Sequence, residues 1–362
     1  MNSTDRGESK PHTARIRRAV RMQLGLALAS AAGLGLALFL VVHSGLNDVL
    51  GILASAGWGL LWLIPVHLAP ITLDAAGWRA LLRGSPQARL PFLVWAAAVR
   101  DAINNLLPVA RVGGEVAGVR LLMVRGVSGT AATASVIVEI TLTLAVQFLF
   151  TVLGLALLLY YLRDHAAAWA IVLALLAGIP AIVIFFLLQH RWGLFQLVER
   201  GLAILTGRRI QSLPGDAAAL DRAIQALYRQ RRVITIGALW QFAGLLAGAG
   251  ELWFTLYLLG NPVTVPAAIL LESLAQAGQS MAFLVPAALG VQEGVFLLFG
   301  AAVGLPADVA IALSLARRVR QIGLGVPVLA SWQWLEGRRL RHMLRRRAKT
   351  GLRAAGQDNV VE

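Results

Sequence analysis

The chain has 362 residues, of which 58% are hydrophobic and 14% are charged, a composition typical of a multi-pass membrane protein and not of a soluble domain. Its net charge of +15 comes from basic blocks between apolar runs, which is the pattern of membrane topology signals and not of a nucleic-acid-binding surface. It contains no cysteine, which excludes disulfides, thiolate metal sites and thiol nucleophiles.

Four apolar stretches are long enough to cross a membrane as helices, since a span needs about 20 apolar residues. They cover residues 22–42, 49–73, 166–188 and 233–250. The first follows a basic leader, but its apolar run is longer than the roughly 7 to 15 residues of a signal-peptide core, so we expect a permanent anchor. The sequence therefore predicts an all-α polytopic integral membrane protein.

The basic residues orient the chain, because cytoplasmic loops carry the excess of Lys and Arg. They gather in the leader 1–21, a short linker at 79–89, a long linker at 191–232 and a tail at 337–362. We therefore expect both termini in the cytoplasm. The long linker is predicted to form amphipathic helices at the cytoplasmic surface.

Two further segments must enter the membrane and return to the side from which they came. Segment 90–126 begins and ends at the cytoplasmic side, whereas segment 262–304 begins and ends outside. We expect each to form a re-entrant helical hairpin, buried in protein or lining a wet cavity, because lipid cannot satisfy the freed backbone groups. The first membrane half then covers 22–190 and the second covers 233–336.

The two expected hairpins share a sequence pattern. PVARVGGE at 108–115 and PAALGVQE at 286–293 both read P-x6-E, and each continues eleven residues further to a glycine, Gly126 and Gly304. Because the hairpins enter from opposite sides, the pattern predicts two halves of inverted topology. Chance similarity between Ala-rich helices is the alternative.

The polar residues of the first hairpin are candidates for a substrate path. A proline that begins a half-helix, as Pro108 does, leaves no N–H unsatisfied, and the turn behind it directs a positive dipole end into the membrane. Gly113 and Gly114 permit a close backbone approach, and Arg111 and Glu115 are expected to share a helix face and neutralise each other. The alternative is that the glycines only pack helices and that Arg111 reaches the head groups.

Polar side chains also recur at helical spacing within other apolar segments, which marks a functional path or a paired structural network. Glu139 and Arg317 each follow the glutamate of their P-x6-E pattern by 24 residues, and an ion pair between the halves explains them as well as a substrate contact does. The predicted substrate path consists of Asn104, Asn105, Pro108, Arg111, Gly113, Gly114, Glu115, Glu139, Glu272, Gln276, Pro286, Glu293 and Arg317.

The stretch NNLLPVARVGGEVAGVRLLMVRGVSGTAATASV, together with VPAALGVQEG, resembles the lysylphosphatidylglycerol-synthase transmembrane, or flippase-like, family and most closely its hopanoid-biosynthesis-associated HpnL membrane proteins. The likeness extends from about residue 22 to 336. It implies movement of a lipid between leaflets of the bacterial inner membrane, with a polar cavity between inverted halves. The synthases of the family carry a soluble aminoacyl-transferase domain after the membrane part. Only a basic tail follows Glu336, so we do not expect that activity.

No recognised catalytic motif is present. The histidines are scattered without a zinc-hydrolase pair, and the sequence contains neither a G-x-S-x-G elbow nor a P-loop. We expect a lipid carrier and not an enzyme, with no metal or cofactor. Its partners are expected to be a membrane lipid and lipid-biosynthesis enzymes, but no nucleic acid. An integral-membrane lipid-modifying enzyme and a non-catalytic partner of lipid-biosynthesis enzymes are the alternatives.

Overall fold

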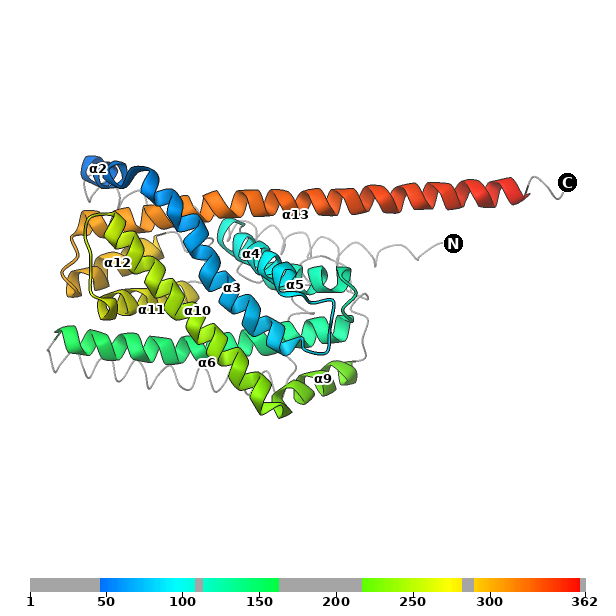
Figure 1. Ribbon diagram of the computed structural model, residues 1–362, viewed down its shortest axis with the longest axis horizontal. Helices are drawn as coiled ribbons and strands as arrows, with labels where there is room; N and C mark the ends of the chain where they lie inside the picture. The colour runs from blue at the N-terminus through cyan, green and yellow to red at the C-terminus, as the bar shows by residue number, and fades with distance from the viewer. Residues whose placement is uncertain (1–45, 108–112, 163–216, 282–289, 359–362) are drawn as a thin grey trace, which may run out of the picture.

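The computed structural model describes residues 46–107, 113–162, 217–281 and 290–358, and every regular element in these ranges is a helix (Figure 1). In chain order the elements are α2 (Leu46–Ala56), the 3-10 helix η1 (Gly57–Trp62), α3 (Leu63–Leu81), α4 (Leu90–Leu106), α5 (Gly113–Val124), α6 (Gly129–Leu162), α9 (Ala217–Arg229), α10 (Arg231–Leu258), α11 (Val265–Met281), α12 (Val291–Ala302) and α13 (Ala307–Asp358).

The expectation of an all-α membrane protein is confirmed for this part of the chain. Three helical stretches are long and apolar enough to cross a membrane: Gly51–Leu81, Gly129–Tyr161 and Arg231–Leu258. The predicted anchor at 22–42 and the predicted span at 166–188 lie outside the described residues. Large apolar side chains such as Leu149 and Leu239, 61% and 63% exposed, cover the outer surface, as contact with lipid requires.

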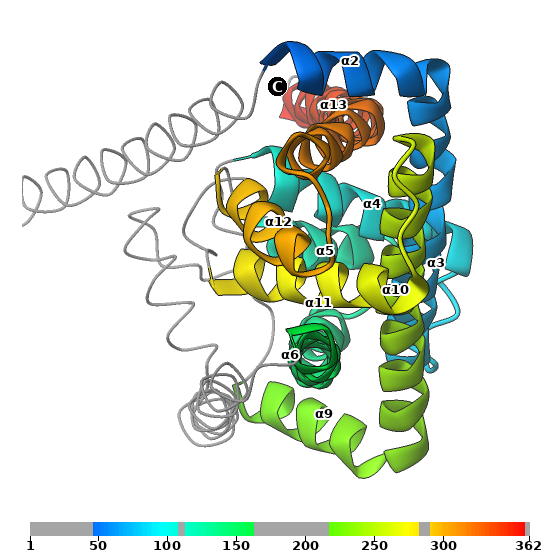
Figure 2. The same ribbon diagram turned by 90° about the vertical axis from the view of Figure 1, so that its left-hand side faces the viewer.

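The predicted span 49–73 is not one straight helix. The chain bends at the 3-10 helix η1, and α2 lies across α13 instead of continuing along the line of α3 (Figure 2). The sequence Gly-Trp-Gly at this point lowers helix propensity without interrupting the apolar run, and Trp58 is 86% exposed. The straight helix α3 therefore begins at Leu63, which places His67 near its start.

Four short helices lie between two long ones. Figure 2 looks along α6 and α13, with α4, α5, α11 and α12 between them and with α3 and α10 side by side on one flank. In Figure 1, α6 and α13 run in opposite directions. The two short pairs match in length, since α4 and α11 each have 17 residues and α5 and α12 each have 12.

The short helices α5 and α12 also end in the same way. Each is followed by a glycine in the left-handed region, Gly126 with φ 88° and Gly304 with φ 76°. The N–H of the residue after each glycine bonds to the carbonyl five positions earlier, at 3.1 Å in the first case and 2.9 Å in the second. This is the hydrogen-bond pattern of a Schellman cap. The glycines that follow the two P-x6-E patterns therefore occupy equivalent positions.

Hydrophobic packing forms two main clusters. One joins α3, α4, α5 and the start of α6, with part of α13 packed against it, and a second joins α10, α11, α12, the start of α13 and the end of α6, with α2 packed against it. A third, smaller cluster attaches α9, the described part of the long basic linker, through Ile224, Leu227 and Tyr228. The largest fully buried side chains include Trp78, Phe150 and Phe296.

Close contact between α6 and α11 generates a stability prediction. A Cβ at position 154 would lie 2.7 Å from the Cβ of Ser273 and closer still to its hydroxyl, so Gly154→Ala must push the two helices apart. We expect a loss of about 1 to 3 kcal/mol, the usual cost of overpacking, measured as a lower melting temperature in detergent. Gly250→Ala, where nothing lies within 4 Å of the added Cβ, is the matched control. A second substitution, Ser273→Gly, should restore stability to Gly154→Ala, and failure to do so would contradict the assigned contact.

Candidate functional site

The interior of the protein contains many ionisable side chains. Four glutamates and two arginines are between 2% and 6% exposed: Glu139, Glu251, Glu272, Glu293, Arg317 and Arg320. A charged group at membrane depth is costly unless it is paired or faces water, so their partners decide what they do. The pairs form four groups, which we name after one member each.

The Arg100 group consists of Trp78, Arg100, Glu115 and Glu139. Nη1 of Arg100 on α4 donates to both carboxylate oxygens of Glu139 on α6, at 3.0 Å and 2.8 Å, and Nη2 donates to Glu115 on α5. The guanidinium also lies 4.5 Å from the ring centroid of Trp78 on α3, which adds a cation–π contact. A single arginine therefore connects four helices.

Asn104 holds the start of α5 against α4. Its Oδ1 accepts the backbone N–H of Gly114 at 3.0 Å, and its Nδ2 faces the carboxylate of Glu115 at 3.5 Å. A Cβ at position 114 would lie 2.6 Å from the carbonyl oxygen of Arg100, so glycine is required for this approach. Gly113 is the first residue of α5.

The Arg317 group consists of Glu272, Gln276, Phe296 and Arg317. Arg317 on α13 donates to Glu272 on α11, which also accepts a hydrogen bond from Gln276 at 3.0 Å. Its guanidinium lies 5.3 Å from the ring centroid of Phe296 on α12. This is the arrangement of the Arg100 group with the charges exchanged, because here the long helix carries the arginine and the short helix carries the glutamate.

The Glu293 group joins the beginning of α12 to α13. Ser314 donates to Glu293 at 2.9 Å, and Gln292 donates to Ser314 at the same distance. The guanidinium of Arg318 lies 3.5 Å from the Glu293 carboxylate. Gln292 also faces Gln279 on α11 at 3.5 Å, so a polar contact links the two arms of the second hairpin as Asn104 links those of the first.

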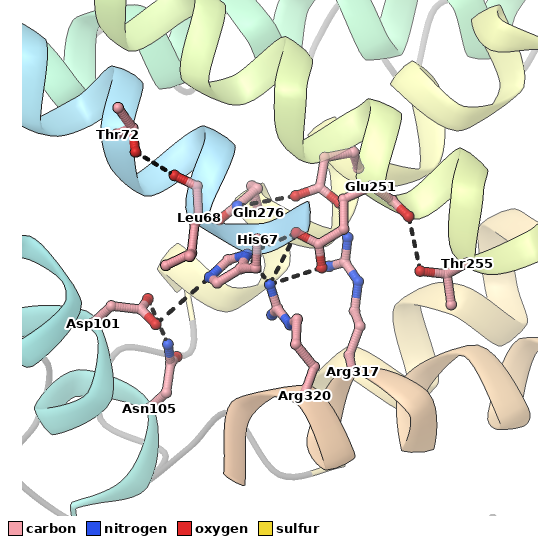
Figure 3. Close-up of polar contacts among 11 residues, drawn as sticks. His67, Leu68, Thr72, Asp101, Asn105, Glu251, Thr255, Gln276, Arg317 and Arg320 are labelled. Atoms are coloured by element: carbon pink, nitrogen blue, oxygen red, sulfur yellow. Dashed lines mark hydrogen bonds and ion pairs between the residues drawn. The ribbon is translucent and has the colours of Figure 1, made fainter. Parts of the chain in front are cut away.

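The Arg320 group consists of His67, Asp101, Glu251 and Arg320 and lies where α3, α4, α10 and α13 meet (Figure 3). Nδ1 of His67 lies 2.7 Å from Glu251, and Arg320 bonds to the same carboxylate at 2.8 Å and 3.0 Å while also contacting His67. On its other side, Nε2 of His67 lies 3.7 Å from Asp101. Asp101, whose side chain is 37% exposed, is the accessible end of the group and accepts a hydrogen bond from Asn105 at 2.7 Å.

The structure assembles most of the predicted substrate path into these groups. Asn104, Gly114, Glu115 and Glu139 meet at Arg100; Glu272, Gln276 and Arg317 meet in the Arg317 group; Glu293 lies in its own group; Asn105 adjoins Asp101; and Gly113 begins α5. Pro108, Arg111 and Pro286 lie outside the described residues.

One of the two explanations offered for Glu139 and Arg317 needs correction. They do not form an ion pair with each other, because Glu139 binds Arg100 and Arg317 binds Glu272. The predicted pairing of Glu115 with Arg111 is not tested, since Arg111 lies outside the described residues; within them Glu115 contacts Arg100, fifteen positions earlier. Spacing along one helix cannot reveal these contacts, since they connect different helices.

Sequence reasoning missed His67 and Glu251. The six histidines form no metal-binding pattern, but His67 lies inside an apolar run, and a polar side chain in such a run has a buried bonding partner or a functional role. Glu251 stands in a similar run within α10. The rule applied to the hairpins therefore identifies them as well, but it does not identify their partners.

The chemistry of the site is that of charge binding. Each arginine of the Arg100, Arg317 and Arg320 groups has an Nε atom without a hydrogen-bond partner in the part of the chain that the structure describes. Such donors suit an oxygen acceptor, as in water or a phosphate. In the same ranges, no three His, Cys, Asp or Glu side chains are placed to hold a metal ion.

Comparison with known proteins agrees with this picture. A family model, the lysylphosphatidylglycerol synthase TM region, matches residues 22–331. The chain belongs to this family. The lysylphosphatidylglycerol synthase TM match includes all four charge groups and ties the chain to a membrane location and to lipid-related processes. None of the curated proteins compared with the chain matches it.

The Arg100 group generates a second prediction. Arg100→Gln should lower the free energy of unfolding by on the order of 3 kcal/mol, because it leaves two carboxylates facing each other in the interior. Arg100→Gln combined with Glu139→Gln should recover part of this loss. The control is Arg120→Gln, which removes an arginine paired with Glu336 but 63% exposed and should cost less than about 1 kcal/mol. Equal melting temperatures for Arg100→Gln and Arg120→Gln in detergent would contradict the structural role of the group.

Proposed function

We propose that the protein is a flippase-like transporter that carries a lipid head group between the leaflets of the bacterial inner membrane. Moving a head group through hydrocarbon is costly, because transfer of each polar group out of water without a hydrogen-bond partner costs about 2 to 7 kcal/mol. The four charge groups supply polar partners from one hairpin to the other. The carboxylate of Asp101, whose side chain is 37% exposed, provides an accessible point of contact for a head group.

The Arg320 group carries this proposal. Its four members come from α3, α4, α10 and α13, so it is shared between the two ends of the chain (Figure 3). Any movement of one half against the other must break or remake its bonds. Alternating access is largely a rigid-body movement of one repeat against the other, and such movements repack the ion pairs at the interface.

We further propose that the halves form an inverted repeat, with re-entrant hairpins at α4–α5 and α11–α12 and both termini in the cytoplasm. The support consists of the matching helix lengths, the matching Schellman caps and the opposite directions of α6 and α13 (Figure 1). The hairpin bonds from Asn104 to Gly114 and from Gln279 to Gln292 occupy corresponding places. An inverted repeat places one binding site between the halves, near the bilayer midplane.

The cargo we propose is a hopanoid or a phospholipid, in keeping with the sequence resemblance. The Arg100 group contains two carboxylates for one arginine, and the Arg320 group contains two carboxylates, one arginine and one histidine. The excess carboxylate of the Arg100 group favours a proton or another cation as a coupled species. We propose transport without covalent change of the lipid, alone or beside lipid-biosynthesis enzymes.

Lipid movement in proteoliposomes tests the function. Protein reconstituted with a trace of fluorescent, tail-labelled phosphatidylglycerol should speed the exchange of the probe between leaflets, measured as the fraction that an impermeant quencher reaches. Glu251→Gln should slow this exchange on the order of tenfold, since a rate change of that size corresponds to about 1.4 kcal/mol, the scale of one lost charged contact. Glu336→Gln, at the surface pair with Arg120, should exchange at the wild-type rate.

The same assay separates a carrier from an enzyme. The recovered probe should be chemically unchanged by mass spectrometry, and deletion of the protein should alter the leaflet in which a native lipid resides without adding or removing a lipid species. Exchange no faster than in protein-free vesicles, for both this probe and labelled native lipid extract, would overturn the proposal. So would the loss of one lipid with accumulation of its precursor.

Chemical labelling tests the topology. Because the chain has no cysteine, a single one introduced at Asn261, in the α10–α11 connection, should react with an impermeant thiol reagent in intact spheroplasts. One introduced at Gln87, exposed in the α3–α4 linker, should react only after lysis. Labelling of Gln87→Cys in intact spheroplasts would contradict the proposed orientation.

A further inference from the structure

A pocket of about 540 Å³ opens beside the α3–α4 linker, apart from the four charge groups. Its walls are the second half of α3, the linker, the first residue of α4 and one face of α10. A volume of this size is ordinary for a small-molecule or head-group site.

The charged side chains of this pocket are all positive. Arg79, Arg83 and Arg89 line it, and no aspartate or glutamate does. All three are exposed, and none forms an ion pair within residues 46–107, 113–162, 217–281 and 290–358. The buried arginines of the charge groups, by contrast, are held by carboxylates of the protein. The pocket therefore offers three guanidinium groups to an anion from outside the chain.

The linker that carries these arginines is held in place by successive turns. Ser85 N–H bonds to the carbonyl of Leu82 at 2.9 Å, and Ala88 N–H bonds to that of Ser85 at 3.0 Å. The side chain of Ala88 is buried in the cluster of the first half. Arg83 and Arg89 therefore project from a fixed backbone, which lowers the entropic cost of gathering positive charge at one place.

Away from the linker the pocket becomes apolar. Leu73 stands six residues before Arg79, about 9 Å further along the axis of α3. Ala76 and Trp240, the latter 42% exposed, continue the apolar wall from there toward the linker, where Ile236 of α10 adds to it. The pocket is therefore basic at the helix ends and apolar one or two turns deeper. This arrangement matches a membrane phospholipid, which has an anionic phosphate at one end and apolar acyl chains at the other.

We propose that this pocket binds an anionic phospholipid of the adjacent leaflet. Its phosphate lies among Arg79, Arg83 and Arg89, and an acyl chain runs along α3 and α10 past Trp240. Basic pockets between membrane helices are known to bind acidic head groups in this manner. The lipid bridges α3 and α10, which carry His67 and Glu251, and so braces the crossing on which the Arg320 group depends. The proposal requires only that the linker lies at a membrane surface, and it holds whether or not the protein transports lipid.

Thermal stability in a neutral detergent tests the pocket without an anionic membrane surface. Phosphatidylglycerol should raise the melting temperature of the wild-type protein, whereas phosphatidylcholine and inorganic phosphate should not. The triple variant Arg79→Gln, Arg83→Gln and Arg89→Gln should bind phosphatidylglycerol on the order of tenfold more weakly or worse. The matched control is Arg229→Gln, Arg231→Gln and Arg232→Gln, which removes the same charge from neighbouring exposed positions that do not line the pocket.

The outcomes are distinct. Wild-type lipid response in the control and loss of response in the pocket variant support the proposal. If phosphatidylglycerol raises the melting temperature equally in both variants, the lipid is attracted to the basic surface in general and the proposal is overturned. If inorganic phosphate raises the melting temperature of the wild-type protein as much as phosphatidylglycerol does, the pocket binds free anions and the lipid site is also overturned. If the triple variant does not fold, Arg83→Gln and Trp240→Ala serve separately, and each should weaken the lipid response. Unchanged response in both would overturn the proposal.

Discussion

Charge pairing away from water is the constraint on which the arrangement of these helices depends. Lipid tails are as apolar as leucine, so hydrophobic burial alone does not determine which membrane helices pack together. In this protein the buried arginines determine it. Arg100 draws together α4, α5 and α6, Arg317 joins α13 to α11, and Arg320 reaches α10 and α3. Seven helices are thereby joined to a neighbour by a bond between charged or polar side chains.

The two hairpins achieve the same connection with opposite charges. In the first, the short helix α4 presents Arg100 to a glutamate of α6, and in the second, the short helix α11 presents Glu272 to an arginine of α13. The two short helices thus match in length, while the charges that they pair with the long helices are of opposite sign.

Sequence patterns located the helices better than they located the contacts. Hydropathy predicted the apolar span within α10, and the P-x6-E pattern led to the matching caps at Gly126 and Gly304. The bend at η1 was missed because the run through it stays apolar. The pairing of His67 with Arg320 joins residues 253 positions apart, and a single sequence contains no local signal of such a pair. Site residues could therefore be recognised in the sequence as polar residues within apolar runs, but their bonding partners could be identified only from the structure.

The last helix, α13, contains both Arg320 and most of the basic tail, so it joins the Arg320 group to the C-terminal part of the chain. α13 has 52 residues and is about 78 Å long, far more than the roughly 30 Å of a hydrocarbon core. It is fastened to the first half by the bond from Trp95 to Ser331 at 3.0 Å. Between this fastening and Arg320 stands Pro327, which lacks the N–H needed for a helical hydrogen bond. A movement of the basic end is thus transmitted along one continuous helix, and the position in it that bends most easily, Pro327, lies about two turns after Arg320.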